Sequence, residues 1–226
     1  TQELFTAGST MRFRLDSYDH LREVASHWQL EPTQLSPGRY TGTLEAVHSE
    51  KIQLALAHHG CGSRMEGIVP RGTIVLCVAM SSFGSMQFRG SCVGERDLLA
   101  HDSAHGLDFS FAGPLRVFSL AVSKNLLESR AGRLWQCDPG NLSSRRLCYA
   151  DPQSPERVCK MLEKRLSQGR RLPQSLVVPQ AAESFENAML DALLSELSEP
   201  RRPEPSLARR RIAHRAAAIL HQRCRE

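Results

Sequence analysis

The sequence predicts an α+β fold in which a barrel or sandwich of short β-strands precedes a helical segment. Between about residues 11 and 122, short apolar stretches recur, and Gly, Pro, Asp or Ser separates them. Several short strands at this spacing are typical of an all-β sandwich or barrel. After about residue 123, apolar residues instead recur with the period of a helix. No run of about 18 apolar residues exists, so the sequence predicts no membrane span.

The first part of the chain is expected to hold strands and one short helix. The predicted strands are 11–16, 38–49, 51–60, 72–80, 85–94, 95–102, 107–113 and 115–123. Residues 40–57 predict a hairpin, because apolar residues alternate with polar ones at Leu44 and Ala46 and then at Ile52, Leu54 and Leu56. The exception lies after the first strand, where i, i+3, i+4, i+7 spacing predicts a helix through Leu21, Val24, Ala25 and Trp28.

The second part predicts three helices. The first begins at Ser123, and the third spans 179–200. The middle helix has Ser154 as its N-cap, Pro155 at the first helical position and Gly169 as its stop signal.

The third helix has a wide apolar face. Every fourth residue along it is large and apolar: Phe185, Met189, Leu193 and Leu197. This face could pack on the preceding helix, or it could form a two-fold interface with a second subunit. The two interpretations are compatible, and we predict a homodimer interface at these four residues.

The positive charge is concentrated at the C-terminal end. Residues 200–226 hold eight Arg and two Glu, whereas residues 1–199 hold 21 basic and 22 acidic side chains. Ser206 is a good N-cap, and an apolar stripe follows at Ile212, Ala216, Ile219 and Leu220. A single amphipathic helix is marginal in water. We therefore interpret residues 207–226 as the first helix of a further domain; a solvated, flexible terminus is the alternative.

The sequence carries no recognisable catalytic or metal-binding motif. The seven Cys form no CxxC pair, which favours free thiols in a reducing cytoplasm. His58 and His59 are adjacent and would face opposite sides of a strand. His101 and His105 lie in a strand–loop–strand pattern, where spacing of four does not chelate. No GxSxG, P-loop or GxGxxG motif appears. We expect no enzyme, metal or cofactor.

The interior of a small barrel either fills with side chains or encloses one small molecule. Arg71 comes before a predicted strand and Arg89 before Gly90, and such paired arginines would suit an anionic ligand. The candidate ligand-binding residues are Arg71, Cys77, Met86, Phe88, Arg89, His101 and Phe109.

Three segments resemble the N-terminal sensor domain of AraC-type bacterial transcription regulators. They are QLSPGRYTGTLEAVHSEKIQLALAHHG (34–60), VPRGTIVLCVAM (69–80) and MQFRGSCV (86–93). The nearest similarity is to the ethanolamine-regulator-like branch, which has a similar LxPGxFxGxL strand. LARRRIAHRAAAIL (207–220) resembles the first helix of that family's DNA-binding domain. One departure is Phe88-Arg89-Gly90, where Trp-x-Gly is expected.

The resemblance implies a cupin-like jelly-roll barrel followed by a helical dimerisation segment. The expected divisions are a sensor barrel (1–122), dimerisation helices (123–199), a linker (200–206) and the first helix of a helix-turn-helix domain (207–226). It further implies a cytoplasmic homodimer that senses a small effector and binds DNA. Phosphate contacts are expected from Arg209, Arg210 and Arg215.

Two other functions stay open at this stage. A regulator that senses a nucleotide second messenger is weakly indicated by the basic stretches at 143–146 and 169–171. A cupin-type metal-dependent enzyme is disfavoured, because the chain lacks a metal triad.

Overall fold

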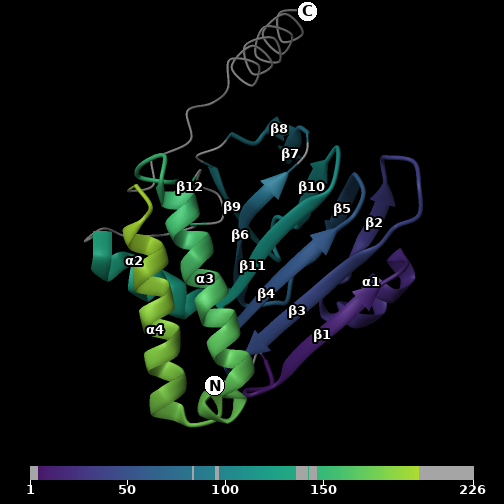
Figure 1. Ribbon diagram of the computed structural model, residues 1–226. Helices are drawn as coiled ribbons and strands as arrows, with labels where there is room; N and C mark the ends of the chain where they lie inside the picture. The colour runs from purple at the N-terminus through teal and green to yellow at the C-terminus, as the bar shows by residue number, and fades with distance from the viewer. Residues whose placement is uncertain (1–4, 83, 95–96, 136–141, 143–146, 199–226) are drawn as a thin grey trace, which may run out of the picture.

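Two antiparallel sheets form the body of the computed structural model, which describes residues 5–82, 84–94, 97–135, 142 and 147–198 (Figure 1). The larger sheet has seven strands. In spatial order they are β1 (Thr10–Leu15), β3 (Gly42–His48), β4 (Ile52–His59), β11 (Leu115–Ser123), β6 (Thr73–Ser82), β9 (Asp97–Asp102) and β12 (Leu147–Cys148).

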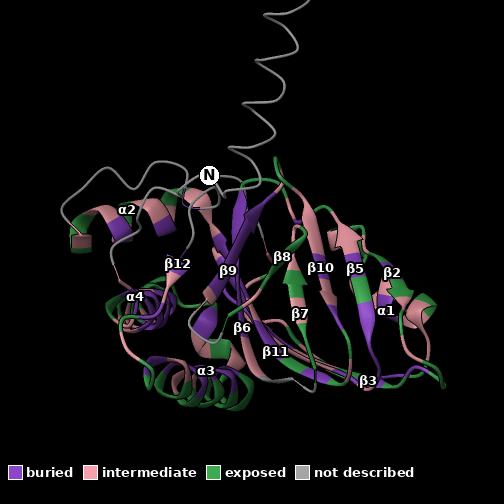
Figure 2. Cartoon of the chain, turned by 90° about the horizontal axis from the view of Figure 1, so that it is seen from above, coloured by how far each residue is buried: buried purple, intermediate pink, exposed green. Residues whose placement is uncertain are grey.

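The smaller sheet has five strands and lies against one face of the larger sheet (Figure 2). Its order is β2 (Glu31–Gln34), β5 (Ser63–Gly67), β10 (Leu107–Phe111), β7 (Met86–Phe88) and β8 (Ser91–Cys92). Helix α1 (Tyr18–Val24) and a short 3₁₀ helix (Ser26–Trp28) connect β1 to β2. The arrangement is a cupin-like jelly roll, so the predicted α+β class is confirmed.

Three helices cover the opposite face of the larger sheet (Figure 2). They are α2 (Lys124–Trp135), α3 (Ser154–Arg171) and α4 (Pro179–Ser195), with a 3₁₀ helix (Pro173–Leu176) between the last two. A single buried cluster contains Leu54, Leu76 and Leu120 from the sheet together with Leu162 and Leu193 from the helices. The sheet and the helices therefore share one hydrophobic core. None of the helices in the described ranges is long and apolar enough to cross a bilayer.

Both faces of the larger sheet are buried. The larger side chains of its strands lie on the face that packs against the helices, and smaller ones lie on the other face. In β4, Ile52 and Leu54 belong to the core shared with the helices. Their neighbours Gln53 and Ala55 are also buried, but they face the smaller sheet. The predicted hairpin is therefore present as β3 paired with β4, and its larger side chains point towards the helices.

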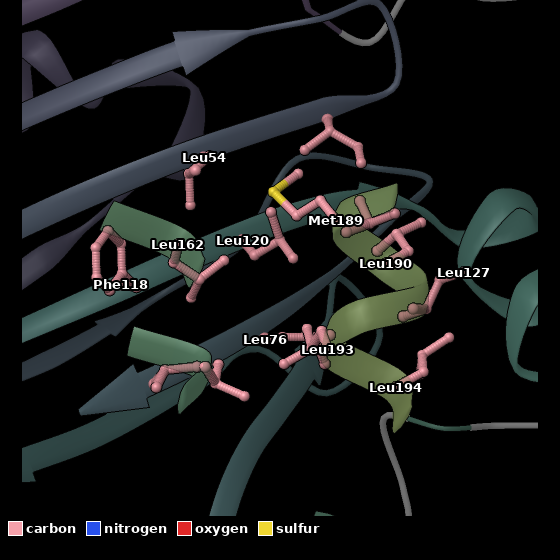
Figure 3. Close-up of a cluster of buried hydrophobic side chains, with 14 of the residues drawn as sticks. Leu54, Leu76, Phe118, Leu120, Leu127, Leu162, Met189, Leu190, Leu193 and Leu194 are labelled. Atoms are coloured by element: carbon pink, nitrogen blue, oxygen red, sulfur yellow. The ribbon is translucent and has the colours of Figure 1, made fainter. Parts of the chain in front are cut away.

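The structure corrects the dimer interface predicted on the last helix, which ends at Ser195, so that Leu197 lies beyond it. Phe185, Met189, Leu193 and Leu197 are 6%, 0%, 0% and 5% exposed, and all four belong to the core of a single subunit. Figure 3 shows Met189 and Leu193 among sheet leucines. A side chain that is buried within its own subunit has no surface to offer a second one. The wide apolar face of α4 is needed because the helix packs on α2 and α3, and its buried side chains belong to the same core cluster as those of the larger sheet. Homodimerisation itself stays a prediction.

Three local expectations also change. The smaller sheet contains two strands, β2 and β5, that the sequence pattern did not show, because both are short and contain Pro or lie between glycines. Residues 85–94 form a hairpin rather than one strand, with Arg89 and Gly90 at φ 50° and 71° in its turn. Gly169 does not stop α3; a Cβ there would lie 3.1 Å from Val47, so the glycine allows the helix to approach the sheet closely.

Candidate ligand-binding site

A cavity of about 530 Å³ lies between the two sheets. This volume falls within the roughly 300–1,000 Å³ that small-molecule sites occupy. Its floor is the face of the larger sheet that points away from the helices. Its walls come from β5 and β10 of the smaller sheet and from the α1 segment.

A row of small side chains forms the floor of the cavity. In the strand register, Ala46 pairs with Ala55, Ala55 with Ser119, and Ser119 with Cys77. These four residues come from four adjacent strands, and all of them line the cavity. On the reverse face of the same strands, the buried residues are mostly leucine, isoleucine, valine and phenylalanine. The interior is hollow because the inward positions at its centre are occupied by residues too small to fill it.

The remaining walls are largely apolar. The cavity is lined by Leu21 and Val24 of α1 and by Trp28 of the 3₁₀ helix that follows it. Phe109 and Phe111 line it from β10. Among the described residues that line it, there is no Asp, Glu, Lys or Arg. The cavity therefore presents apolar and uncharged polar groups to a ligand.

One group of cavity side chains forms a continuous hydrogen-bond chain. Trp28 Nε1 donates to Gln53 Oε1 at 3.1 Å, and Gln53 Nε2 lies 2.7 Å from His48 Nε2. Because an amide nitrogen only donates, His48 Nε2 accepts, and Nδ1 carries the proton towards Ser9 Oγ. Burial, with a smaller contribution from His27, lowers the pKa of His48 to about 4, which keeps this imidazole neutral. The chain fixes the tautomer of His48 and uses both ring nitrogens.

A second group surrounds His59. Tyr40 Oη lies 2.9 Å from His59 Nδ1, and the rings of Tyr18 and Tyr40 are 4.2 Å apart. Tyr18 Oη in turn lies 2.6 Å from Ser63 Oγ. Burial, assisted by His58, lowers the pKa of His59 to about 4, and burial raises the pKa of Tyr40. The tyrosine therefore stays protonated and can donate to a neutral imidazole.

His101 differs from His48 and His59, the other two buried histidines of the cavity. Its side chain is 0% exposed, and within the described part of the chain neither ring nitrogen has a hydrogen-bond partner. Burial, then the nearby Arg89, lowers the pKa of His101 to about 3, against an opposing effect of Asp102. A buried polar group without a partner costs about 1–3 kcal/mol. The free protein therefore carries an unsatisfied neutral imidazole on the wall of its cavity.

The structure brings only part of the predicted ligand-binding set to the cavity. Cys77, His101 and Phe109 line it. Met86 lines a smaller neighbouring hollow of about 220 Å³ instead. Arg71 is exposed on the turn before β6 and lies outside both linings, because the chain turns outward there.

Phe88 and Arg89 lie beside His101 without lining the cavity. The Phe88 ring centroid is 6.0 Å from that of His101, and the Arg89 guanidinium lies 4.8 Å above the Phe88 ring. Arg89 Nη2 donates to the carbonyl of Gly106 at 3.2 Å. The two arginines expected to hold an anion thus do not converge on the cavity.

Sequence reasoning missed several lining residues, Trp28, His48, Gln53 and His59 among them. A signal was present in residues 53–59, where every second residue reads Gln, Ala, Ala, His while the intervening positions begin with two leucines. Small and polar residues on one face of a strand, opposite large ones, indicate a hollow rather than a filled interior.

The features behind the two open alternatives are not assembled into sites in the described ranges. No group of three or more His, Cys, Asp or Glu that could hold a metal ion occurs there. The basic stretch 143–146 lies outside the described residues. In the stretch 169–171, Arg170 forms an ion pair with Glu45.

No protein-family model and no curated protein matches the sequence. Among solved structures, the AraC-like transcriptional activator CuxR aligns over 92% of this chain and 78% of its own, with a TM-score of 0.50 and 10% identity. The chain has the fold of an AraC-like regulator.

Other solved structures resemble parts of this chain. A conserved protein of unknown function from Pseudomonas aeruginosa PAO1 covers 50% of it and aligns over 56% of its own length, at 15% identity and a TM-score of 0.30. A cupin superfamily protein from Desulfitobacterium hafniense covers 42% of it and aligns over 77% of its own length, at 14% identity and a TM-score of 0.27.

The three buried histidines of the cavity, His48, His59 and His101, predict that this domain loses stability in mild acid. An unfolded histidine titrates near pH 6.5, whereas these three have folded pKa values of about 4, 4 and 3. Below pH 6.5 the unfolded chain therefore binds protons that the folded chain does not. Stability is fully present above pH 6.5 and falls as the pH drops towards 4, by up to about 1.4 kcal/mol per pH unit for each histidine.

Urea unfolding between pH 7.5 and 5 measures this dependence. His101→Phe removes one of the three groups and is expected to make the profile shallower. A profile that stays flat from pH 6.5 to 5 would contradict the account, since it would mean that these imidazoles titrate alike in the folded and unfolded chain.

Proposed function

We propose that the chain is the effector-sensing and dimerisation portion of an AraC-type transcription regulator. The observation that carries the proposal is the hollow between the sheets, built by a row of small residues at the centre of a fold shared with CuxR. A small molecule that enters this cavity is the signal. The proposal assigns the domain no catalytic step, metal or cofactor, and it places the protein in the cytoplasm as a homodimer.

The larger sheet couples the cavity to the helices because the same strands line the cavity on one face and contact the helices on the other. Ala55 and Ser119 face the cavity, while their chain neighbours Leu54 and Leu120 pack against the helical layer. Interiors are close-packed, so a shift of these strands cannot be absorbed without movement of the helices. An effector regulates through this route when it binds two arrangements of the helices with different affinities.

In this proposal, the movement of the helices reaches the C-terminal part of the chain at the end of α4. Arg157 of α3 binds Glu196 with Nε–Oε1 at 2.8 Å and Nη2–Oε2 at 2.5 Å, and Ser154 Oγ donates to the same carboxylate. Beyond the helix, Ser198 N donates to the carbonyl of Cys148 at 2.9 Å. These contacts fix where the chain leaves the domain. The basic residues 200–226 follow directly, so movement of α4 changes how they are presented to DNA.

The DNA-binding part of the proposal predicts a change in salt dependence. Residues 207–226 lie outside the described ranges; in the proposal, Arg209, Arg210 and Arg215 neutralise phosphates. Each phosphate contact contributes about 0.9 to the slope of log K against log salt on duplex DNA. Replacing all three with Ala should reduce the slope by as much as ~2.7. Fluorescence anisotropy of a labelled duplex, titrated with the 226-residue chain between 50 and 200 mM salt, measures it.

A matched control removes the same charge elsewhere. Lys160, Lys164 and Arg171 are exposed on α3, and their triple Ala variant should keep the original slope. Equal slopes for all three proteins would remove the phosphate contacts from the proposal. A slope lowered only in the control would place the DNA-contacting surface on α3.

A further inference from the structure

The cavity also indicates what kind of molecule it takes, if it is the effector site proposed above. The lining is apolar over most of its area and has no Asp, Glu, Lys or Arg among the described residues. Transfer of an unpaired carboxylate or phosphate into such surroundings is strongly unfavourable. An anionic or cationic effector would therefore leave its charge uncompensated.

The arginine nearest to the cavity does not change this conclusion. Arg89 lies close enough to His101 to lower the pKa of that imidazole. However, Arg89 also interacts with two carboxylates, Asp102 and Asp108, and its guanidinium lies over the Phe88 ring. Arg89 is also absent from the lining of the cavity, so its guanidinium does not face a ligand bound there.

The polar groups of the lining differ in what they have left to offer. Both ring nitrogens of His48 are engaged, one by Gln53 and one by Ser9. Tyr40 occupies Nδ1 of His59. His101 alone among these histidines has neither nitrogen paired within the described part of the chain. A neutral imidazole offers one N–H donor and one acceptor, which a hydroxyl group complements in either direction.

We propose that the effector is an uncharged, mainly apolar small molecule, such as an aromatic or alicyclic alcohol or phenol, whose hydroxyl group binds His101. In the free protein, water does not reach either nitrogen of His101. The imidazole turns about its Cβ–Cγ bond, whose torsional preference is broad, and presents a nitrogen to the ligand. The apolar body of the ligand lies along the row formed by Ala46, Ala55, Ser119 and Cys77.

Three naphthalenes that share a ring system test this class: 1-naphthol, 1-methylnaphthalene and 1-naphthoate. Isothermal titration calorimetry at pH 7 on the 226-residue chain should show 1-naphthol binding about tenfold more tightly than 1-methylnaphthalene, with 1-naphthoate the weakest. His101→Phe should bring the first two compounds to about equal affinity. His101→Gln, which keeps a donor and an acceptor, should retain the preference for 1-naphthol.

The outcomes test the ligand class, the role of His101 and the function of the cavity. Tightest binding by 1-naphthoate would overturn the uncharged class and leave a sensing cavity in place. A preference for 1-naphthol that survives in His101→Phe would overturn the role of His101; if that variant does not fold, the same preference lost in His101→Gln would do so. Absence of binding by all three compounds would overturn both the class and the proposed function of the cavity.

Discussion

Leu193→Glu is expected to unfold the chain rather than to release a folded monomer. Leu193 is 0% exposed and lies between the larger sheet and the neighbouring helices (Figure 3). Loss of a buried leucine side chain alone costs about 2–5 kcal/mol. A carboxylate in the same place adds the penalty for an unpaired buried charge. The sum approaches the whole stability of a typical domain, roughly 5–15 kcal/mol.

Urea unfolding followed by circular dichroism measures this effect. Leu172→Glu is the matched control, because Leu172 is 50% exposed at the end of α3 and the same substitution there should change stability by about 0.5 kcal/mol or less. A Leu193→Glu protein that stays folded and has half the mass of the parent would contradict the account. That result would return Leu193 to a dimer interface.

Ala55→Trp is expected to remove ligand binding while the fold persists. Ala55 lies at the centre of the cavity floor, and its neighbours across the strands are Ala46 and Ser119, which leave room for an indole. The new side chain occupies the space that a ligand would take. Affinity for 1-naphthol should fall about 100-fold, which corresponds to about 2.7 kcal/mol. Because the added ring enters an existing hollow, the free energy of unfolding should change by only about 1 kcal/mol.

Calorimetry with 1-naphthol and urea unfolding give the two quantities. Ser110→Trp places the same side chain on β10 at a partly exposed position that does not line the cavity, and should leave the affinity unchanged. Undiminished binding in Ala55→Trp would show that the ligand binds elsewhere. Severe destabilisation would show that the cavity is much smaller than the structure indicates.

The division into strands and then helices could be predicted from the sequence because hydrophobic period is local information. The helix through Leu21 and the start of α3 near Pro155 follow the same rule and are present. Strands β2 and β5 were missed because a strand of four or five residues that contains Pro or lies between glycines carries little periodic signal. Pairing with neighbours distant in sequence, and not local propensity, stabilises such strands.

The apolar face of α4 did not by itself show what the helix packs against. The stripe on α4 shows that Met189 and Leu193 are covered, but a sheet and a second subunit would require the same residues. The helical layer and the sheet are consecutive in the chain, and they meet through contacts between residues that are far apart in sequence. These long-range contacts bury the apolar face of α4 within its own subunit, so the interface predicted from the spacing is wrong.

The candidate site was predicted only where a single residue type stood out. Cys77, His101 and Phe109 were found, whereas the small residues that make the hollow were not, because an alanine alone gives no chemical signal. The row from Ala46 to Cys77 appears only when four strands are aligned in register. Arg71 was selected for its charge, and it lies on an exposed turn.

The most direct test of the central claim is a crystal structure of the protein purified gently from its native source. The account predicts electron density for an organic molecule between the two sheets, lying over Ala55 and Ser119 with a polar atom within hydrogen-bond distance of His101. Sheets that have closed on each other, or a cavity filled by the protein's own side chains, would contradict it.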